Sequence, residues 1–306
     1  MRSDESRLAW LGPLSVGLLV LAAPGTEAAL APGVELPPLV TPASHERHWG
    51  KFIWADLVTP DLQRAEQFYG GLFGWTFVPA VGDPNFAVVW LNGRPIAGLV
   101  QRPLRPDEDR RPAWLTFLAA RDVSAARAKA ASLGARLLSP ARLYRARGRQ
   151  AVFADPEGAV FALLDSSSGD PADVTPEPGY WIWSSLLVED PDKEAAFYRA
   201  LFGYDVFDLS ADDSHARHLL LAREQYARAG ISSLPHDERS RHPHWLDFVR
   251  VDDAAAAVAK AVELGGRVLV EPRTDRQGGH LAVVADPFGA AIGLMEWSDT
   301  TAQAAP

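Results

Sequence analysis

Apolar and polar positions follow the same pattern twice along this chain. Residues 52–58 form a short apolar run with the length and composition of a strand. The next apolar residues recur at spacings of three, four and three, which places them on one helical face: Leu62, Ala65, Tyr69 and Leu72. Gly74 would end this helix, and residues 75–78 indicate another strand. The pattern predicts a helix laid across a sheet.

The pattern returns at residues 181–207 with a constant offset of 129. Identical residues at this offset include Trp54/Trp183, Asp61/Asp190, Tyr69/Tyr198 and Gly74/Gly203. A repeat of this length indicates two copies of one structural unit. Each copy therefore begins with the same strand, helix and strand.

The second half of each copy resembles its first half. In the first copy, residues 114–118 indicate a strand, 125–133 a helix that Gly134 ends, and 149–164 a hairpin. Trp114/Trp245 and Asp155/Asp286 mark the same region of the second copy, at an offset of 131. A surface loop tolerates such a two-residue insertion. The chain is therefore predicted to contain four related modules in an α+β fold.

The motifs at the ends of these modules resemble those of one family. The segments T-P-D, then F-Y-x-x-L-F-G-W, and later A-x-x-A-D-P-x-G-A resemble the vicinal oxygen chelate superfamily of glyoxalases, bleomycin-resistance proteins and extradiol dioxygenases. The resemblance covers nearly all of residues 49–298, twice. It implies two tandem domains, each with paired β-α-β-β-β modules whose sheet curves into an open cup facing a small ligand.

The predicted organisation has six segments. They are a signal peptide at 1–29, a proline-rich linker at 30–49, domain 1 at 50–167, a linker at 168–178, domain 2 at 179–298 and a tail at 299–306. Each repeat has an apolar helix face and a full set of strands, so we expect the two domains to fold separately.

The resemblance also implies a divalent metal held by His, Gln or Glu at four points of each domain. Carried over to this chain, the first-strand points of the first modules fall on Trp54 and Trp183, and those of the second modules fall on Leu115 and Leu246. The last-strand points fall on Ala162 and Gly293. The remaining points, within 96–100 and 229–233, contain no carboxylate. Apolar groups do not bind such cations. We therefore expect no metal and no other cofactor, and no catalytic residue is identified.

Histidines are concentrated in domain 2. His215 and His218, and His242 and His244, form two closely spaced pairs, but no acidic residue accompanies them at a metal-binding spacing. Titrating loop histidines are the simpler interpretation.

Tryptophans paired with polar residues are the candidate ligand contacts. If the small apolar residues meet the helix, alternation along each strand turns eight residues into the cups: Trp54, Asp56, Trp114, Thr116, Trp183, Ser185, Trp245 and Asp247. In the second modules this register differs by one residue from the one that the family resemblance implies, and both remain open. Aromatic walls with a few polar groups are typical of small-molecule pockets. Alternatively, the tryptophans fill the cups as core.

Composition restricts the partners and the compartment. The net charge of −9 argues against a nucleic-acid partner, and the absence of cysteine excludes disulfides. Residues 8–23 are apolar but too short to span a membrane, and small residues at 26–29 offer a cleavage site. We expect export to the periplasm or the exterior, with no stable membrane insertion of the mature chain. An uncleaved anchor, or a cytoplasmic protein with a mis-assigned start, is the alternative.

These observations favour binding of a small planar or aromatic molecule without metal. One alternative is a metal-dependent lyase or dioxygenase of the glyoxalase type. The other is a non-catalytic structural or interaction protein with filled cups. The sequence does not specify the ligand or the oligomeric state.

Overall fold

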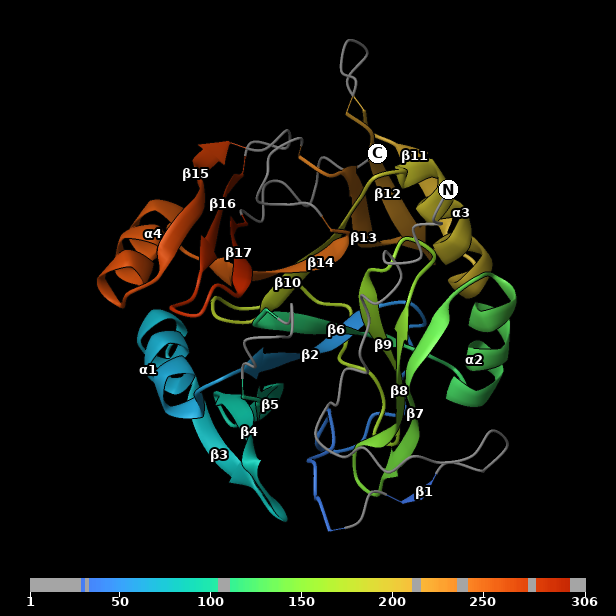
Figure 1. Cartoon of the computed structure of the whole chain (residues 1–306), viewed down its shortest axis with the longest axis horizontal. Helices are drawn as coiled ribbons and strands as arrows, with labels where there is room; N and C mark the ends of the chain where they lie inside the picture. Colours follow the sequence, from blue (N-terminus) through green and yellow to red (C-terminus); the bar gives the residue numbers. More distant parts are fainter. Residues whose placement is uncertain are drawn as a thin grey trace, which may run out of the picture.

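The computed structural model describes residues 29–30, 33–103, 111–210, 216–235, 242–274 and 279–297. The predicted tail, His215 and nearly all of the predicted signal peptide lie outside these residues. The described chain forms two tandem domains of related architecture (Figure 1). Each domain contains two β-α-β-β-β modules, which confirms the α+β fold with paired modules.

Domain 1 follows the predicted order of elements, and a short strand β1 (Ala29–Leu30) precedes it. Its first module contains β2 (Phe52–Thr59), α1 (Leu62–Phe73), β3 (Thr76–Ala80), β4 (Asp83–Leu91) and β5 (Arg94–Gln101). Its second module contains β6 (Ala113–Ala119), α2 (Val123–Ser132), β7 (Arg136–Tyr144), β8 (Gly148–Ala154) and β9 (Val160–Ser166).

Domain 2 repeats this order. Its first module contains β10 (Trp181–Val188), α3 (Pro191–Phe202), β11 (Asp205–Asp208), β12 (His218–Arg223) and β13 (Tyr226–Ser233). Its second module contains β14 (His244–Val251), α4 (Ala254–Glu263), β15 (Arg267–Thr274), β16 (His280–Ala285) and β17 (Ala291–Glu296).

Each domain is built on one mixed sheet. The strand order is β1-β7-β8-β9-β6-β2-β5-β4-β3 in domain 1 and β11-β12-β13-β10-β14-β17-β16-β15 in domain 2. The two modules of a domain join where their first strands pair antiparallel, β2 with β6 and β10 with β14. We call the concave faces of the two sheets cup 1 and cup 2.

Equivalent residues begin and end the first helix of each domain. The carboxylates of Asp61 and Asp190 accept hydrogen bonds from backbone N–H groups in the first turns of α1 and α3. Gly74 and Gly203 end these helices with φ values of 72° and 75°, a left-handed conformation that glycine adopts without a steric cost. The repeated letters of the sequence thus correspond to the repeated helix boundaries.

The helices and the convex faces of the two sheets form cores that both domains share. One core combines α1 with β14, α4, β16 and β17, and the other combines α2, β8 and β9 with β10 and α3. Figure 1 shows α1 beside α4 on one side of the molecule and α2 beside α3 on the other. Each repeat has the apolar helix faces and strands predicted for it, but it buries these faces together with the other domain. We expect residues 50–167 and 179–298 to be unstable apart, because each fragment would expose half of both cores.

Reciprocal hydrogen bonds connect the two domains. The hydroxyl of Tyr69 in α1 lies 3.3 Å from Asp286 of domain 2, and Trp114 donates its indole N–H to that hydroxyl at 3.1 Å. The corresponding three residues are joined by the same bonds at 3.0 and 3.2 Å: Tyr198, Asp155 and Trp245. The repeated F-Y and D-P-x-G motifs therefore specify how the domains dock.

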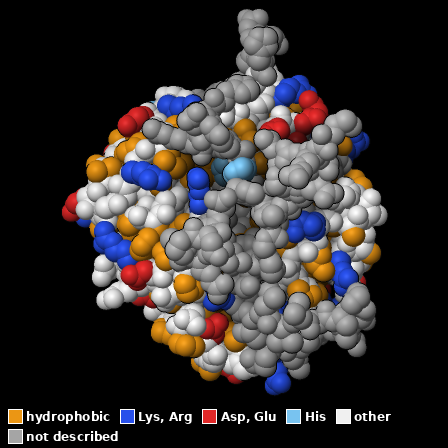
Figure 2. Space-filling view, viewed as in Figure 1, with side chains coloured by type: hydrophobic (Ala, Val, Ile, Leu, Met, Phe, Trp, Pro, Cys, Tyr) orange, Lys and Arg blue, Asp and Glu red, His pale blue; other side chains and the backbone are white. Residues whose placement is uncertain are grey.

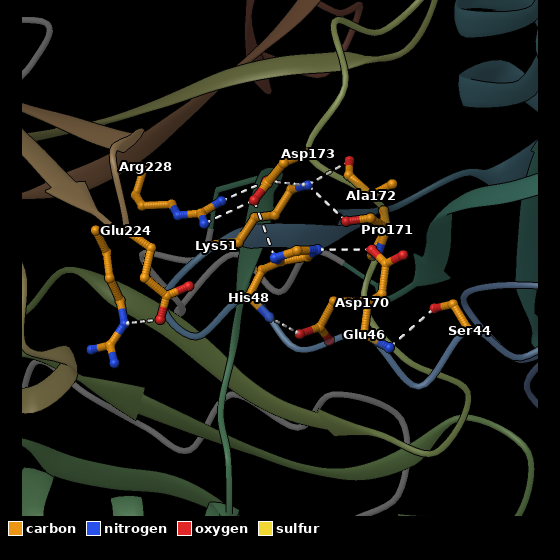
Figure 3. Close-up of polar contacts among 11 residues, drawn as sticks. Ser44, Glu46, His48, Lys51, Asp170, Pro171, Ala172, Asp173, Glu224 and Arg228 are labelled. Carbon is orange, nitrogen blue, oxygen red and sulfur yellow. Dashed lines mark hydrogen bonds and ion pairs between the residues drawn. The ribbon is translucent and has the colours of Figure 1, made fainter.

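The linker between the domains is bound to both of them (Figure 3). Arg228 of β13 donates to both oxygens of Asp173, at 2.6 and 2.9 Å, a bidentate geometry that strengthens the pair. Lys51, which precedes β2, lies 2.8 Å from the same carboxylate, and His48 lies 3.1 Å from it. Asp173 thus joins the linker to domain 1 and to domain 2.

None of the helices in the described part of the chain is both long and apolar enough to cross a membrane.

Candidate ligand-binding site

Four of the eight predicted ligand contacts face the cups. Trp54 belongs to the apolar cluster that lines cup 1, and its indole N–H donates to Asp56 at 2.7 Å. Trp183 packs in the cluster that lines cup 2, and its indole N–H donates to Ser185 at 2.9 Å. The two pairs occupy the same position of β2 and β10.

The other four residues point away from the cups, which corrects the orientation expected for them. Trp114 and Trp245 lie in the shared cores beside Tyr69 and Tyr198. Thr116 of β6 donates to both oxygens of Asp247 in β14, at 3.0 and 2.9 Å. These residues join the two domains where β6 meets β14.

Asp247 is a buried carboxyl group with hydroxyl partners. Besides Thr116, it accepts a hydrogen bond of 2.6 Å from Ser184 of β10. Burial raises the pKa of Asp247 to about 7, although both hydroxyl groups lower it. This contact is part of the domain interface and lies outside both cups.

Burial on both faces of β6 and β14 explains the wrong orientation. Leu115 and Phe117 line cup 1, and Leu246 and Phe248 line cup 2, while their neighbours along each strand enter the shared cores. With no solvent-exposed face, alternation cannot identify the concave side. The register implied by the family resemblance, with Leu115 and Leu246 facing the cups, is the one that the structure has.

Cup 1 contains a buried charged group that the sequence analysis missed. Arg147, from the turn between β7 and β8, is fully buried, and its guanidinium lies 3.7 Å from the centre of the Trp54 ring. Burial raises the pKa of Asp56 to about 6, an effect that the Trp54 N–H and the Arg147 charge oppose. Burial lowers the pKa of Arg147 to about 10, so the guanidinium is protonated at neutral pH.

Cup 2 is more accessible at the same positions. Ile182, Trp183 and Ser185 are all partly exposed, whereas their counterparts Ile53, Trp54 and Asp56 are buried. Gly230 lies opposite Ser185, and a β-carbon there would lie 3.1 Å from the Ser185 hydroxyl. A side chain at this position would crowd Trp183 and Ser185, and glycine avoids that contact.

A row of polar residues crosses cup 2 beside the tryptophan. Ser232 and His244 lie opposite Leu187, which lines the cup, and His218 lies opposite Ser232. Residues directly opposite in a sheet project from the same face, and His218 Nδ1 lies 2.7 Å from the Ser232 hydroxyl. Figure 2 shows histidine side chains at the surface over β13 and β14, with hydrophobic side chains beside them.

The interpretation of these histidines as loop groups was therefore incomplete. His218 and His244 are the first residues of β12 and β14. For His244 a signal was available, because it directly precedes Trp245, the equivalent of the first residue of the strand predicted at 114–118.

The donor set of the described residues does not fit a divalent metal. Among these residues, no group of three or more His, Asp or Glu side chains converges on one point. The cup-facing residues at the positions that the resemblance assigns to the metal include Trp183, Leu246, Gly293 and, within 229–233, Gly230 and Ser232, and none of these is a His, Gln or Glu. In cup 1, the carboxylate of Asp56 accepts a hydrogen bond from the indole N–H of Trp54.

Comparison with known proteins gives consistent matches. The profile of the glyoxalase-like domain family matches residues 53–164 and again 184–295. "Putative glyoxylase CFP32" from Mycobacterium tuberculosis is 32% identical over 265 residues, which cover 83% of this chain and 98% of the relative. The anthracycline biosynthesis protein DauV of Streptomyces sp. (strain C5) is 32% identical over 259 residues, covering 79% of this chain and 92% of the relative.

Solved structures share the fold at low sequence identity. The Mn(II)-bound glyoxalase from Novosphingobium aromaticivorans aligns with a TM-score of 0.58 at 18% identity, covering 81% of this chain and 82% of that chain. The 2,2',3-trihydroxybiphenyl 1,2-dioxygenase from Sphingomonas wittichii strain RW1 aligns with a TM-score of 0.58 at 19% identity, covering 82% and 91%. These similarities concern the fold.

Proposed function

The chain belongs to the glyoxalase-like domain family, in two tandem copies, and from this premise we propose that cup 2 binds a small planar, aromatic molecule without a metal ion. The observation that carries the proposal is the partly exposed indole of Trp183 in a cup whose counterpart is buried. Ser185 accepts the indole N–H, which holds the ring in one orientation. A fixed aromatic face stabilises a stacked ring by about 0.5–1.5 kcal/mol beyond area burial.

Polar groups beside the ring would orient the ligand. The Ser185 hydroxyl can donate to a carbonyl or phenol oxygen of a molecule stacked on Trp183, because it accepts from the indole N–H. Ser232 and His244 lie on the same concave face. A mainly apolar wall with a few hydrogen-bonding groups suits an oxygen-substituted ring system.

The names of two relatives support this ligand class. DauV and DnrV are both named as anthracycline biosynthesis proteins, and anthracyclines are built on a planar fused-ring core. Both relatives match most of this chain. We extend only the chemical class, a planar oxygenated ring system, to this protein.

The metal-dependent chemistry of the family is not part of the proposal. Because Trp183, Leu246 and Gly293 stand at the metal-binding points, we expect the purified protein to contain no stoichiometric Zn, Ni, Mn or Fe. Elemental analysis of the full chain tests this expectation. One equivalent of tightly bound metal per domain, or metal-dependent turnover of a hemithioacetal, would contradict it.

Ligand binding is tested by quenching of tryptophan fluorescence with 1,4-dihydroxyanthraquinone. We expect saturable quenching, and Trp183→Leu should weaken binding about tenfold because it removes the stacking face. Trp54→Leu, at the equivalent position of cup 1, is the matched control and should leave the affinity within about twofold. Equal losses in the two variants would refute the assignment to cup 2. An absence of saturable quenching would favour the structural alternative.

We also propose that the protein is exported. The mature chain is expected to begin within residues 29–31: a start at Ala29 would keep β1 (Ala29–Leu30), whereas a start at Ala31 would remove it. N-terminal sequencing of protein from the native cell should begin in this region. A soluble protein that retains Met1 in the cytosol would rule this out.

A further inference from the structure

Residues 33–40, which we call the strap, cross cup 1 from one edge to the other. On one side, the Nε–H of Arg147, in the turn between β7 and β8, donates to the backbone oxygen of Pro37 at 2.7 Å. On the other side, the backbone N–H of Glu35 donates to Val81 at 3.0 Å, in the turn between β3 and β4. Strands β7 and β3 lie near opposite ends of the domain 1 sheet. The proline-rich segment expected to be a linker is thus bound across the mouth of a cup.

The strap fills the interior of the cup. Leu36 and Leu39 are each 6% exposed and pack in the same cluster as Trp54 and Phe117. These two leucines occupy the space that a ligand ring would take in an open cup. The strap therefore acts as an intramolecular occupant of cup 1.

The strap satisfies Arg147 only in part. The Nε–H of Arg147 donates to the backbone oxygen of Pro37 at 2.7 Å. Its Nη2 is buried and has no hydrogen-bond partner among the described residues. A buried donor without a partner is costly, and Nε and Nη2 form one edge of the guanidinium that matches the two oxygens of a carboxylate. The carbonyl oxygen of Pro37 thus accepts from Nε alone, at a place where the two oxygens of a carboxylate could accept from both Nε and Nη2.

We propose that cup 1 is a second, latent binding site for a planar aromatic carboxylate, which the strap keeps closed. On displacement of the strap, the carboxylate accepts from Arg147 Nε and Nη2, and the ring replaces Leu36 and Leu39 against the apolar wall. At the equivalent positions of the domain 2 sequence, Ser185 and Gly278 replace Asp56 and Arg147. The proposal is independent of ligand binding in cup 2.

The direct test opens the strap in the full chain. We expect the double variant Leu36→Ser, Leu39→Ser in a Trp183→Leu background to bind one equivalent of 2-naphthoate by calorimetry, at least about tenfold more tightly than the Trp183→Leu parent, in which the ligand must first displace the strap. The neutral isostere 2-naphthamide should bind the opened chain about tenfold more weakly, and Arg147→Gln should remove that preference. A folded, opened chain that binds no naphthoate, or that binds acid and amide equally, would overturn the proposal.

A second measurement uses the unaltered chain, in case the opened variant does not fold. The backbone N–H groups of Glu35 and Val40 are hydrogen-bonded to Val81 and Ser168, so their hydrogen exchange reports on the strap. Saturating 2-naphthoate should accelerate exchange at both amides, and 2-naphthamide should do so less. Unchanged exchange at both positions would refute displacement of the strap.

Discussion

Cup 1 and cup 2 are built from the same module and differ in what fills them. Trp54 is 2% exposed and lies between Asp56 and Arg147, under the strap. Trp183, its counterpart, is partly exposed and bonds only a serine hydroxyl. Duplication therefore kept the strands, the helices and the domain interface, while the concave faces diverged.

The difference shows that the surfaces holding the two domains together are distinct from the concave faces that vary. Reciprocal contacts such as Tyr69 with Asp286 and Tyr198 with Asp155 hold the convex sides together in the same way in both halves. The cups contribute nothing to this docking and can change independently. Cup 1 has become part of the core of domain 1, whereas Trp183 and Ser185 of cup 2 remain partly exposed.

The largest expected effect concerns the two tryptophans. Trp54→Ala should lower the free energy of unfolding by about 3–5 kcal/mol, because it leaves a large cavity and removes the ring under Arg147. Trp183→Ala should lower it by about 1 kcal/mol, since that ring is partly exposed. Urea unfolding followed by circular dichroism measures both. Equal costs would mean that cup 2 is as closed as cup 1.

The tyrosines at the interface should behave alike, in contrast to the tryptophans of the cups. Tyr69→Phe and Tyr198→Phe each remove a hydroxyl that bonds both a tryptophan and an aspartate. Each variant should lose about 1–3 kcal/mol of stability, because buried partners are left without hydrogen bonds. Urea unfolding of the two variants side by side checks the symmetry. A difference as large as that between the tryptophan variants would show that the interface has diverged too.

Stability should depend on pH through the carboxyl group of cup 1. Because burial raises the pKa of Asp56 to about 6, the folded chain keeps a proton that the unfolded chain releases near pH 4. The stability contributed by this proton is full below pH 4 and is lost as pH rises through about 6. Asp56→Ser, which introduces the cup 2 residue, should reduce the decline in stability between about pH 5 and pH 8 by about 1 kcal/mol.

Thermal unfolding across this pH range measures the effect. Ser185→Ala, at the equivalent position, is the control and should leave the slope unchanged. A parallel decline in Asp56→Ser and the unaltered chain would assign the pH dependence to other buried carboxyls, such as Asp247.

The smallest expected effect is on Ser185 itself. Ser185→Ala removes the acceptor of the Trp183 indole N–H. Because the ring is partly exposed and water can replace the acceptor, stability should fall by no more than about 1 kcal/mol. Affinity for 1,4-dihydroxyanthraquinone should also fall, since the ring loses its fixed orientation. An unchanged affinity would show that the serine does not orient the indole for binding.

The sequence by itself determined the modules and their boundaries. The repeated letters predicted four strand–helix–strands units, and Asp61 and Gly74 occur at the ends of α1 as capping chemistry requires. These are local properties, set by backbone conformation and hydrogen bonding within a few residues. The orientation of Trp54 and Trp183 toward the cups was also predictable, because Ala55, next to Trp54, and Leu186, three residues after Trp183, alternate with them and pack in the shared cores.

Only the tertiary structure decided which faces became sites. Trp114 and Asp247 belong to strands buried on both sides, so their pattern of apolar residues could not distinguish a cup from a domain interface. The contact between Arg147 and Pro37 joins residues 110 positions apart along the chain, and no periodicity in the sequence indicates it. The strap, the shared cores and the accessibility of cup 2 depend on which segments far apart in sequence pack together, and this is settled only when the whole chain has folded.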